Sequence, residues 1–315
     1  MRNEVKEKMV DCPGGGVQRF IRFARQTDFS TTGTTFRYMS LAQNAEDEIT
    51  NENIESTGIE NINVVQNVGG TRQSTATCEF HYKVGRVFEL AFGTPTHSET
   101  TDDWVHTFNE ELDPPYWTIV VGSDAEQTRA SRHVGMLLDS MNISYEINGN
   151  VSIETSFVGN FDDKITSKPS HTVVGTQVLT NRHCTFNINS TAVKRVQSAS
   201  INITHATEPI HGDGVDMECN VFLGRTVEFT VNGAMNTSVY GDHVKDEDIT
   251  SVELVVDNGV TLGDGKVGFE VELDQIVVTS LAETGSVGSI TTFTLSGVGR
   301  ITGLVATDQI ASTDW

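Results

Sequence analysis

The sequence predicts an all-β protein, or a β-rich α+β protein, in which two sandwich or barrel domains follow each other, each with one short helix. Three observations lead to this prediction. Apolar and polar residues alternate in many short runs, the chain has 28 glycines, many of them between these runs, and a pattern in the first half returns in the second. Short alternating runs separated by turn residues are typical of β-sandwiches and barrels.

The clearest pair of strands lies near the middle of the chain. Ser140–Ile147 and Val151–Phe157 place apolar residues at every second position. Asn148 and Gly149 lie between them, and Asn-Gly favours a type I′ turn, in which both central residues take positive φ. This segment predicts a β-hairpin. Further alternating runs lie at Ile59–Val68, Ser74–Tyr82, Trp117–Val121, Val196–Thr204, Met217–Leu223, Val227–Val231, Gly268–Leu273, Ile276–Leu281 and Ser289–Leu295.

Helix is predicted at only two places. Lys83–Phe92 carries apolar residues at helical spacing, and Gly93 supplies a C-terminal stop. Asp248–Asp257 begins with an N-cap residue and ends before Gly259. Its valine-rich part fits a strand equally well.

Two parts of the sequence resemble each other. Leu138–Ser144 parallels Leu273–Thr279, and a glycine turn and a threonine-rich strand follow each segment. A repeat of this length predicts tandem domains and not a solenoid of short units. We therefore expect an N-terminal arm at residues 1–30, a first domain at 31–161, a linker at 162–182 and a second domain at 183–315.

The chain is strongly acidic. Its 43 Asp and Glu against 21 Lys and Arg give a formal charge of −22. Such a field opposes nucleic-acid binding, which requires cations to replace the counterions of the phosphates. It favours solubility, or a wall along which a polyanion slides without sticking. The composition fits a halophilic protein working in high salt, where charges are screened over short distances; an ordinary acidic protein is the alternative.

Catalytic signatures are missing from the sequence. It contains no GxSxG, HExxH, Walker or Rossmann GxGxxG motif, and its four cysteines lie far apart. We therefore predict no enzyme, no catalytic residues and no cofactor. Asp213, Asp216 and Glu218 are weak candidates for a metal site, because Ca²⁺ takes several oxygens from one loop. The alternative for this segment is an exposed hairpin tip.

Basic residues gather at one place only. Arg19, Arg22 and Arg25 alternate with apolar residues near the N-terminus. We expect them to contact an acidic neighbouring subunit or another part of the same chain. Contact with nucleic acid is the weaker alternative, because the net charge opposes it.

Six segments follow each other in a characteristic order: Arg25–Thr32, Asn53–Gly58, Gly70–Phe80, Gly135–Gly159, Val196–Thr204 and Gly224–Arg225. This order resembles the major tail tube proteins of long-tailed phages and of haloarchaeal tailed viruses. The resemblance implies a structural virion protein, assembled in the host cytoplasm, whose β-sandwich domains join in rings that stack into the hollow tail tube. It also implies partners: tape measure, tail terminator and baseplate or initiator proteins, with viral DNA passing through the lumen without specific binding and no membrane contact.

In this family six domains ordinarily surround the channel. Three chains with two domains each would then form a pseudo-hexameric ring, and a hexamer is the alternative if the duplication fails. About 24 strands, ~4.8 Å apart and tilted ~40°, close at a backbone diameter of ~48 Å, which leaves room for a DNA duplex. The lumen candidates lie on the hairpins at 141–158 and 276–296, and the residues singled out are Asn142, Ser144, Glu146, Ser152 and Glu154.

The sequence alone does not settle which face of these hairpins is luminal. Two rival functions remain at this point. One is a β-sandwich receptor-binding or decoration protein of the virion. The other is an enzyme that acts on polysaccharide through paired carboxylates such as Asp213 and Glu218.

Overall fold

The computed structural model describes residues 19–311, except 58–63, 102, 110–113, 124–129, 166, 173–176, 235–248 and 286–290. Sixteen strands form one connected sheet, and every pair of neighbouring named strands is antiparallel. Helix in the described residues is limited to the 3-10 turn η1 (Gly85–Phe88), the helix α1 (Glu89–Phe92) and the 3-10 turn η2 (Asn181–His183). The predicted all-β class is confirmed.

The strands of the first half are β1 (Arg19–Arg25), β2 (Phe36–Arg37), β3 (Leu41–Thr57), β4 (Val64–His81), β5 (Thr96–Glu99), β6 (Trp104–Phe108), β7 (Trp117–Ser123), β8 (Ala130–Glu146) and β9 (Ser152–Ile165). Those of the second half are β10 (Cys184–Ile188), β11 (Thr191–Ala192), β12 (Val196–His211), β13 (Met217–Ala234), β14 (Ser251–Asp257), β15 (Gly268–Thr284) and β16 (Thr292–Asp308).

The strands of the two halves pair in the same order. In the first half the order is β2-β1-β7-β8-β9-β4-β3, and in the second it is β11-β10-β14-β15-β16-β13-β12. The halves join where β8 pairs with β12. The hairpin of β5 and β6 is additional, because β6 pairs with β16 of the second half.

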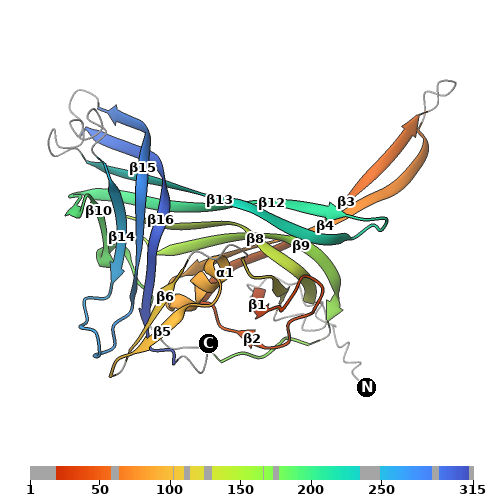
Figure 1. The fold of residues 1–315 in the computed structure, drawn as a ribbon, viewed down its shortest axis with the longest axis horizontal. Helices are drawn as coiled ribbons and strands as arrows, with labels where there is room; N and C mark the ends of the chain where they lie inside the picture. Colours follow the sequence, from red (N-terminus) through yellow and green to blue (C-terminus); the bar gives the residue numbers. More distant parts are fainter. Residues whose placement is uncertain are drawn as a thin grey trace, which may run out of the picture.

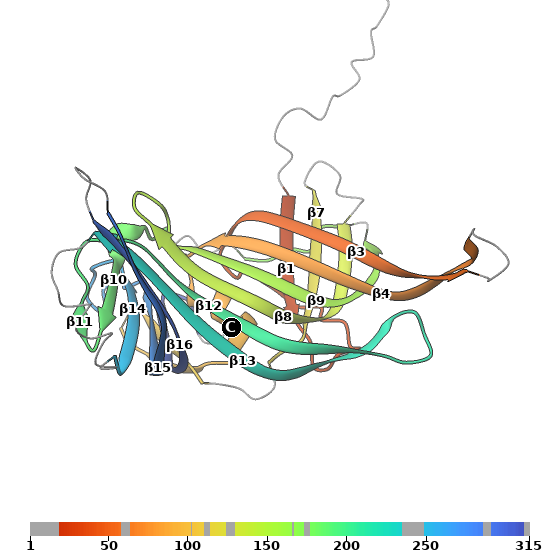
Figure 2. The same ribbon diagram turned by 90° about the horizontal axis from the view of Figure 1, so that it is seen from above.

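Eight long strands form a curved sheet in the order β3-β4-β9-β8-β12-β13-β16-β15. Figure 1 shows most of them crossing the upper part of the molecule, while β14, β15 and β16 descend at one end; α1 and the shorter strands lie below. Figure 2 shows the same sheet from above, with β3, β4 and the β12–β13 hairpin extending beyond the body. We call these eight strands the long sheet.

One face of the long sheet covers the hydrophobic core. A row of paired residues crosses five strands on this face: Phe80, Ile153, Ile143, Ile201 and Phe229. All five are buried, because residues at alternate positions of a strand point to the same face. The period-two runs of the sequence therefore predicted the core correctly.

The predicted helix at Lys83–Phe92 is confirmed with a shorter start. It begins at Gly85 as a 3-10 turn and continues as α1, whose residues are all buried. Gly93 ends it with φ 75°, a conformation that suits glycine. The helical alternative for Asp248–Asp257 is wrong: Ser251–Asp257 is strand β14, in which Val252 and other alternate residues are buried. Asp248 itself lies outside the described residues.

The middle hairpin is confirmed, but its turn type is not. Asn148 takes φ 63°, whereas Gly149 has no positive φ. The backbone N–H of Gly149 donates to the carbonyl of Glu146 at 2.9 Å. The two central residues are therefore Ile147 and Asn148, as in a type II turn, and not Asn148 and Gly149. Asn can take this position because it tolerates the left-handed conformation.

Residues Arg19–Arg25, expected in an N-terminal arm, lie inside the fold as β1. The strand pairs with β7 along its whole length, and Phe20, Ile21 and Phe23 are buried. Residues 1–18, with the Pro-Gly-Gly-Gly segment, lie outside the described part. In the expected linker, β9 continues to Ile165 and the remaining described residues are mostly irregular.

The two halves are packed together by more than the β8–β12 pair. The hydroxyl of Tyr82 donates to the carbonyl of Gly268 at 2.8 Å. Asp308, fully buried, accepts the backbone N–H of Gly85 at 2.7 Å and lies 3.0 Å from Nε2 of His106. These contacts hold the second half of the long sheet against the helical segment of the first half.

Candidate functional surface: the polar face of the long sheet

The face of the long sheet opposite the core is lined by polar side chains in continuous rows. The first row is Asn44, Glu79, Glu154, Asn142, Asn202 and Glu228, each paired with the next across neighbouring strands. The second is His81, Ser152, Ser144, Ser200, Thr230 and Ser296. The third is Glu46, Thr77, Ser156, Ser140, Thr204 and Thr226. The fourth is Glu146, Ser198, Asn232 and Thr294.

These four rows are called the polar face below. They contain neither lysine nor arginine, and their charged residues are glutamates. Buried rows lie between them, because alternate residues of each strand point to the core. The surface is therefore neutral to acidic over strands from both halves of the chain.

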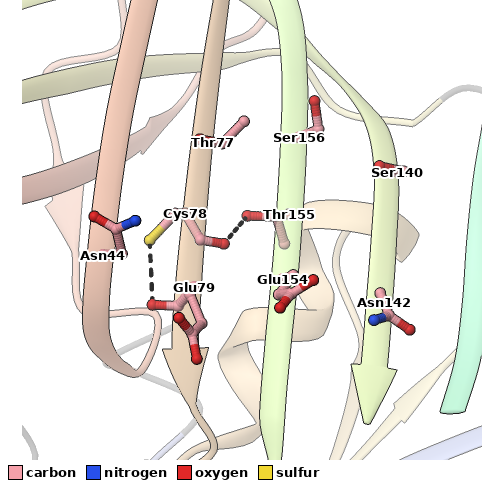
Figure 3. A pocket seen from close by; sticks show the side chains of 9 residues that line it. All are labelled: Asn44, Thr77, Cys78, Glu79, Ser140, Asn142, Glu154, Thr155 and Ser156. Atoms are coloured by element: carbon pink, nitrogen blue, oxygen red, sulfur yellow. Dashed lines mark hydrogen bonds between the residues drawn. The ribbon is translucent and has the colours of Figure 1, made fainter.

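Two carboxylates face each other at the centre of the first half of this surface. Glu79 and Glu154 are directly paired on β4 and β9, and Glu154 is paired with Asn142 on its other side. Figure 3 shows these side chains around a shallow open depression of about 300 Å³. Like charges directly opposite each other destabilise a sheet. The position therefore keeps negative charge at a cost in stability, which favours a role for the charge itself.

Hydroxyl and amide groups connect the strands of the second half. Asn232 donates from Nδ2 to the hydroxyl of Ser198 at 3.0 Å, and its Oδ1 accepts from the hydroxyl of Thr294 at 2.6 Å. Thr230 and Ser296 are 3.1 Å apart through their hydroxyl oxygens. Because these groups satisfy one another, the surface offers few fixed donors to a passing ligand.

All five lumen candidates of the sequence lie on this face. Asn142, Ser144 and Glu146 come from β8, and Ser152 and Glu154 from β9. The sequence analysis did not single out their paired neighbours on β4, β12 and β13, whereas Thr294 and Ser296 of β16 belong to the second hairpin that it named. The alternation that assigns a residue to this face can be read in the sequence at Ser74–Tyr82, Val196–Thr204 and Val227–Val231. The sequence does not show which of these distant strands are neighbours in the sheet.

The three arginines near the N-terminus make contacts within the chain. Arg19 lies 3.2 Å from Asp47, and Arg25 lies 3.5 Å from the buried carboxylate of Glu89. Arg22 donates to the carbonyl of Pro169 at 3.3 Å. These contacts correspond to the second expectation, contact with another part of the same chain. Contact of the three arginines with a neighbouring subunit stays a prediction.

The weak metal candidates lie at the tip of the β12–β13 hairpin. Asp216 forms an ion pair with Arg72 at 2.6 Å. Among residues that the structure describes, no group of three or more His, Cys, Asp or Glu is placed to hold a metal ion. The same described residues contain no helix long and apolar enough to span a membrane.

One arrangement has the composition of a catalytic triad. The hydroxyl of Ser74 lies 2.5 Å from Nδ1 of His133, and Nε2 of His133 lies 3.3 Å from Asp47. A nucleophile needs access to its substrate, yet Ser74 and His133 are fully buried. The arrangement links β3, β4 and β8 and is structural.

A known protein family matches most of the chain. The family described as phage tail tube protein matches residues 16–259, more than half of the chain. The comparison with curated proteins gives no match. The chain therefore belongs to the phage tail tube protein family, whose members are structural components of the virion tail.

Proposed function

We propose that three copies of the chain close into a ring, and that stacked rings form a tube whose channel is lined by the polar face. The observation that carries this proposal is the long sheet itself: eight long strands, seven of which contribute to the polar face, with two open edges. The shorter strands and α1 then form the outer wall. DNA leaving the capsid passes along the channel into the host.

The edges of the long sheet fit a closed barrel. In the described part of the chain, β3 pairs with β4 alone, and β15 beyond Asp274 pairs with β16 alone. All pairs are antiparallel and the strand number is even, so β3 and β15 of adjacent copies run antiparallel. Exposed edges are templates for aggregation, and closure removes them.

The number of long strands favours three copies. Three long sheets supply about 24 strands, which close at ~48 Å for ~4.8 Å spacing and ~40° tilt. Six copies would give about 48 strands and a diameter of roughly 96 Å by the same relation. Only the smaller channel encloses a single duplex closely.

The equal strand order of the two halves supports the tandem-domain proposal. Each half supplies four strands to the long sheet, so three chains present six equivalent units around the channel. On this basis we place the first unit at Arg19–Ile165 and the second at Cys184–Asp308. The first unit thus includes β1, which corresponds to β10 in the second.

The glutamates of the polar face explain how DNA passes without sticking. A protein surface binds DNA when its Lys and Arg side chains neutralise the phosphates and release the counterions condensed on the DNA. The polar face has neither, so the duplex moves along it without specific contacts. We also propose that the tube meets tape measure, terminator and baseplate or initiator proteins at its ends, and that its acidity suits a high-salt environment.

Mass photometry and electron microscopy of the purified protein test this proposal. We expect assemblies in multiples of three chains, and rings or tubes under conditions that promote polymerisation. Assemblies in multiples of six without a three-chain unit contradict the trimeric ring. A monomer that binds cells or capsids and never forms rings instead supports a receptor-binding or decoration protein.

A further inference from the structure

The strands β8 and β15 carry the same two irregularities at the same places. Where β8 pairs with β9, Gly135 begins a bulge of two residues opposite one, and Gln275 begins the same bulge where β15 pairs with β16. Both residues have positive φ, 60° and 50°. A single extra residue follows four positions later in each strand, at Asp139 and at Thr279. Each of these positions of β8 therefore corresponds to the position 140 residues later in β15.

The strands β3 and β12 correspond in the same way. An extra residue interrupts the pairing of β3 with β4 at Gln43, and the pairing of β12 with β13 at Gln197. Beyond it, Asn44–Asn51 and Ser198–His205 pair with their neighbours without a shift. Each of these positions of β3 therefore corresponds to the position 154 residues later in β12.

The two correspondences agree across the sheet. One row of paired residues in the first half is Asn44, Glu79, Glu154 and Asn142. The row at the corresponding positions of the second half is Ser198, Asn232, Thr294 and Ala282. The two halves are therefore equivalent residue by residue, and not only in the order of their strands.

The halves of one chain are joined by the pairing of β8 with β12, from Ser140 opposite Thr204 to Glu146 opposite Ser198. We call this pairing the internal joint. The counterparts of its two strands are β15 and β3, which form the open edges of the long sheet and lie at opposite ends of the molecule (Figure 1). The chain therefore contains one complete joint and the two separate sides of a second.

Apolar side chains are exposed at the open edges where the internal joint has buried ones. Ile49 on β3 is 37% exposed, whereas its counterpart Ile203 on β12 is fully buried. Val277 on β15 is 60% exposed, whereas its counterpart Leu137 on β8 is 1% exposed. Joining the two edges through a second copy of the chain is expected to cover these side chains and to pair the open backbone groups.

We propose that β15 of one copy pairs with β3 of the next in the register of the internal joint. This inference rests on the proposed ring and specifies which residues meet where two copies join. Ile49 then lies opposite Leu281, as Ile203 lies opposite Met141 in the internal joint. The pairs of described strand residues, with the β3 residue first, are Glu46 and Thr284, Asp47 and Glu283, Glu48 and Ala282, Ile49 and Leu281, and Thr50 and Ser280.

One of these pairs differs in character from the internal joint. Asp47 and Glu283 take the positions of Ile201 and Ile143, and like charges directly opposite each other destabilise a sheet. Arg19 lies 3.2 Å from Asp47, and its side chain remains 45% exposed. Because a guanidinium has five N–H donors, we expect Arg19 to bind both carboxylates and to neutralise the pair.

Cysteine pairs across the contact test the register. Residues directly opposite in an antiparallel sheet have Cα atoms about 4.5–5.5 Å apart, within the ~4.4–6.8 Å that a disulfide spans. A slip of two residues increases this distance to about 7–8 Å. The expected pair is Glu48→Cys with Ala282→Cys, and the two controls combine Glu48→Cys with Ser280→Cys or with Thr284→Cys. All four positions are exposed and lie on the polar side of the sheet.

The assembled variants are oxidised mildly and separated without reducing agent, and mass spectrometry identifies the joined peptides. The wild type, with its own four cysteines, gives the background. We expect the Glu48→Cys, Ala282→Cys variant to form linked chains roughly tenfold faster than either control, because only its Cα atoms are close enough. Since β3 and β15 are opposite edges of the long sheet, each such link joins two copies. The final product should be a covalent ring of three chains.

A second variant tests the burial of Ile49 without new cysteines. Ile49→Lys places a charge in the contact, and its control is Leu262→Lys, at a residue between β14 and β15 that is 44% exposed. Circular dichroism and thermal unfolding establish that both variants are folded. We expect Ile49→Lys to need on the order of tenfold more protein for assembly, and Leu262→Lys to assemble like the wild type.

The outcomes separate this inference from the proposed function. If wild-type rings form and a control pair cross-links as fast as the expected pair, or no pair cross-links, the register is wrong and the ring stands. If rings form and Ile49→Lys assembles like the wild type, Ile49 does not lie in the contact and the inference fails. If the wild type forms no ring, both proposals fail.

Discussion

The buried carboxylate of Glu89 gives the most direct test of how the fold is held together. Glu89 is the first residue of α1 and is fully buried. Its Oε1 lies 2.9 Å from Arg37 and 3.5 Å from Arg25, and these arginines remain 25% and 30% exposed. Replacing Glu89 with Gln keeps the shape of the side chain and removes the charge that both arginines face.

The expected loss of stability follows from these exposures. Breaking a buried ion pair costs about 3–5 kcal/mol, because the remaining charge stays unpaired. Water reaches both arginines here and solvates their charge, so we expect Glu89→Gln to lower the free energy of unfolding by about 2–4 kcal/mol. Unfolding entropy is about 0.7 kcal/mol per degree for a chain of this length, so the melting temperature should fall by roughly 3–6 °C in calorimetry.

The matched control is Glu99→Gln, because Glu99 is exposed at the end of β5. It should change the melting temperature by less than about 1 °C. A second variant, Arg37→Met in the Glu89→Gln background, should cost less than the two single changes together. If Glu89→Gln melts with the wild type, the ion pair does not stabilise the fold and this reasoning is wrong.

Three further changes test other parts of the account. Glu146→Lys with Glu154→Lys should leave folding intact and slow genome delivery, because cations on the polar face hold phosphates; unchanged delivery kinetics would argue against a luminal position. Burial and a neighbouring arginine lower the pKa of His205 to about 3, so the unfolded chain binds this proton first and stability falls as the pH drops from about 6.5. Urea unfolding from pH 7 to 4 should therefore show a shallower decline for His205→Gln, and an identical slope would refute this role. Gly93→Ala should cost about 1–3 kcal/mol because Gly93 has φ 75°, whereas Gly214→Ala should be neutral, because a Cβ at Gly214 meets only the backbone nitrogen of Asp216 at 4.0 Å.

The sequence was sufficient for the fold class and for the residues of the polar face that it singled out. Period-two alternation marks a strand and assigns its two faces, so Asn142 and Glu154 were found on one surface. It does not tell which distant strand pairs with which. Glu79 beside Glu154, and Asn202 beside Asn142, followed only from the register of β4 and β12.

Other features depend on tertiary contacts that no local pattern encodes. The stretch around Val252 satisfied the rules for a strand and a helix equally, and pairing with β10 and β15 decided for a strand. Arg19–Arg25 resembled a separate arm, and pairing with β7 placed it inside the fold.

The central claim is that the polar face lines a channel closed by three copies. Electron cryomicroscopy of assembled tubes tests it most directly, by showing how many chains form a ring and which residues border the lumen. We predict three chains per ring, β3 beside β15 of the next copy, and Asn142, Glu154 and Glu228 facing the channel. A ring of six chains, or a lumen bordered by β1 and β7 with the polar face outside, would contradict the account.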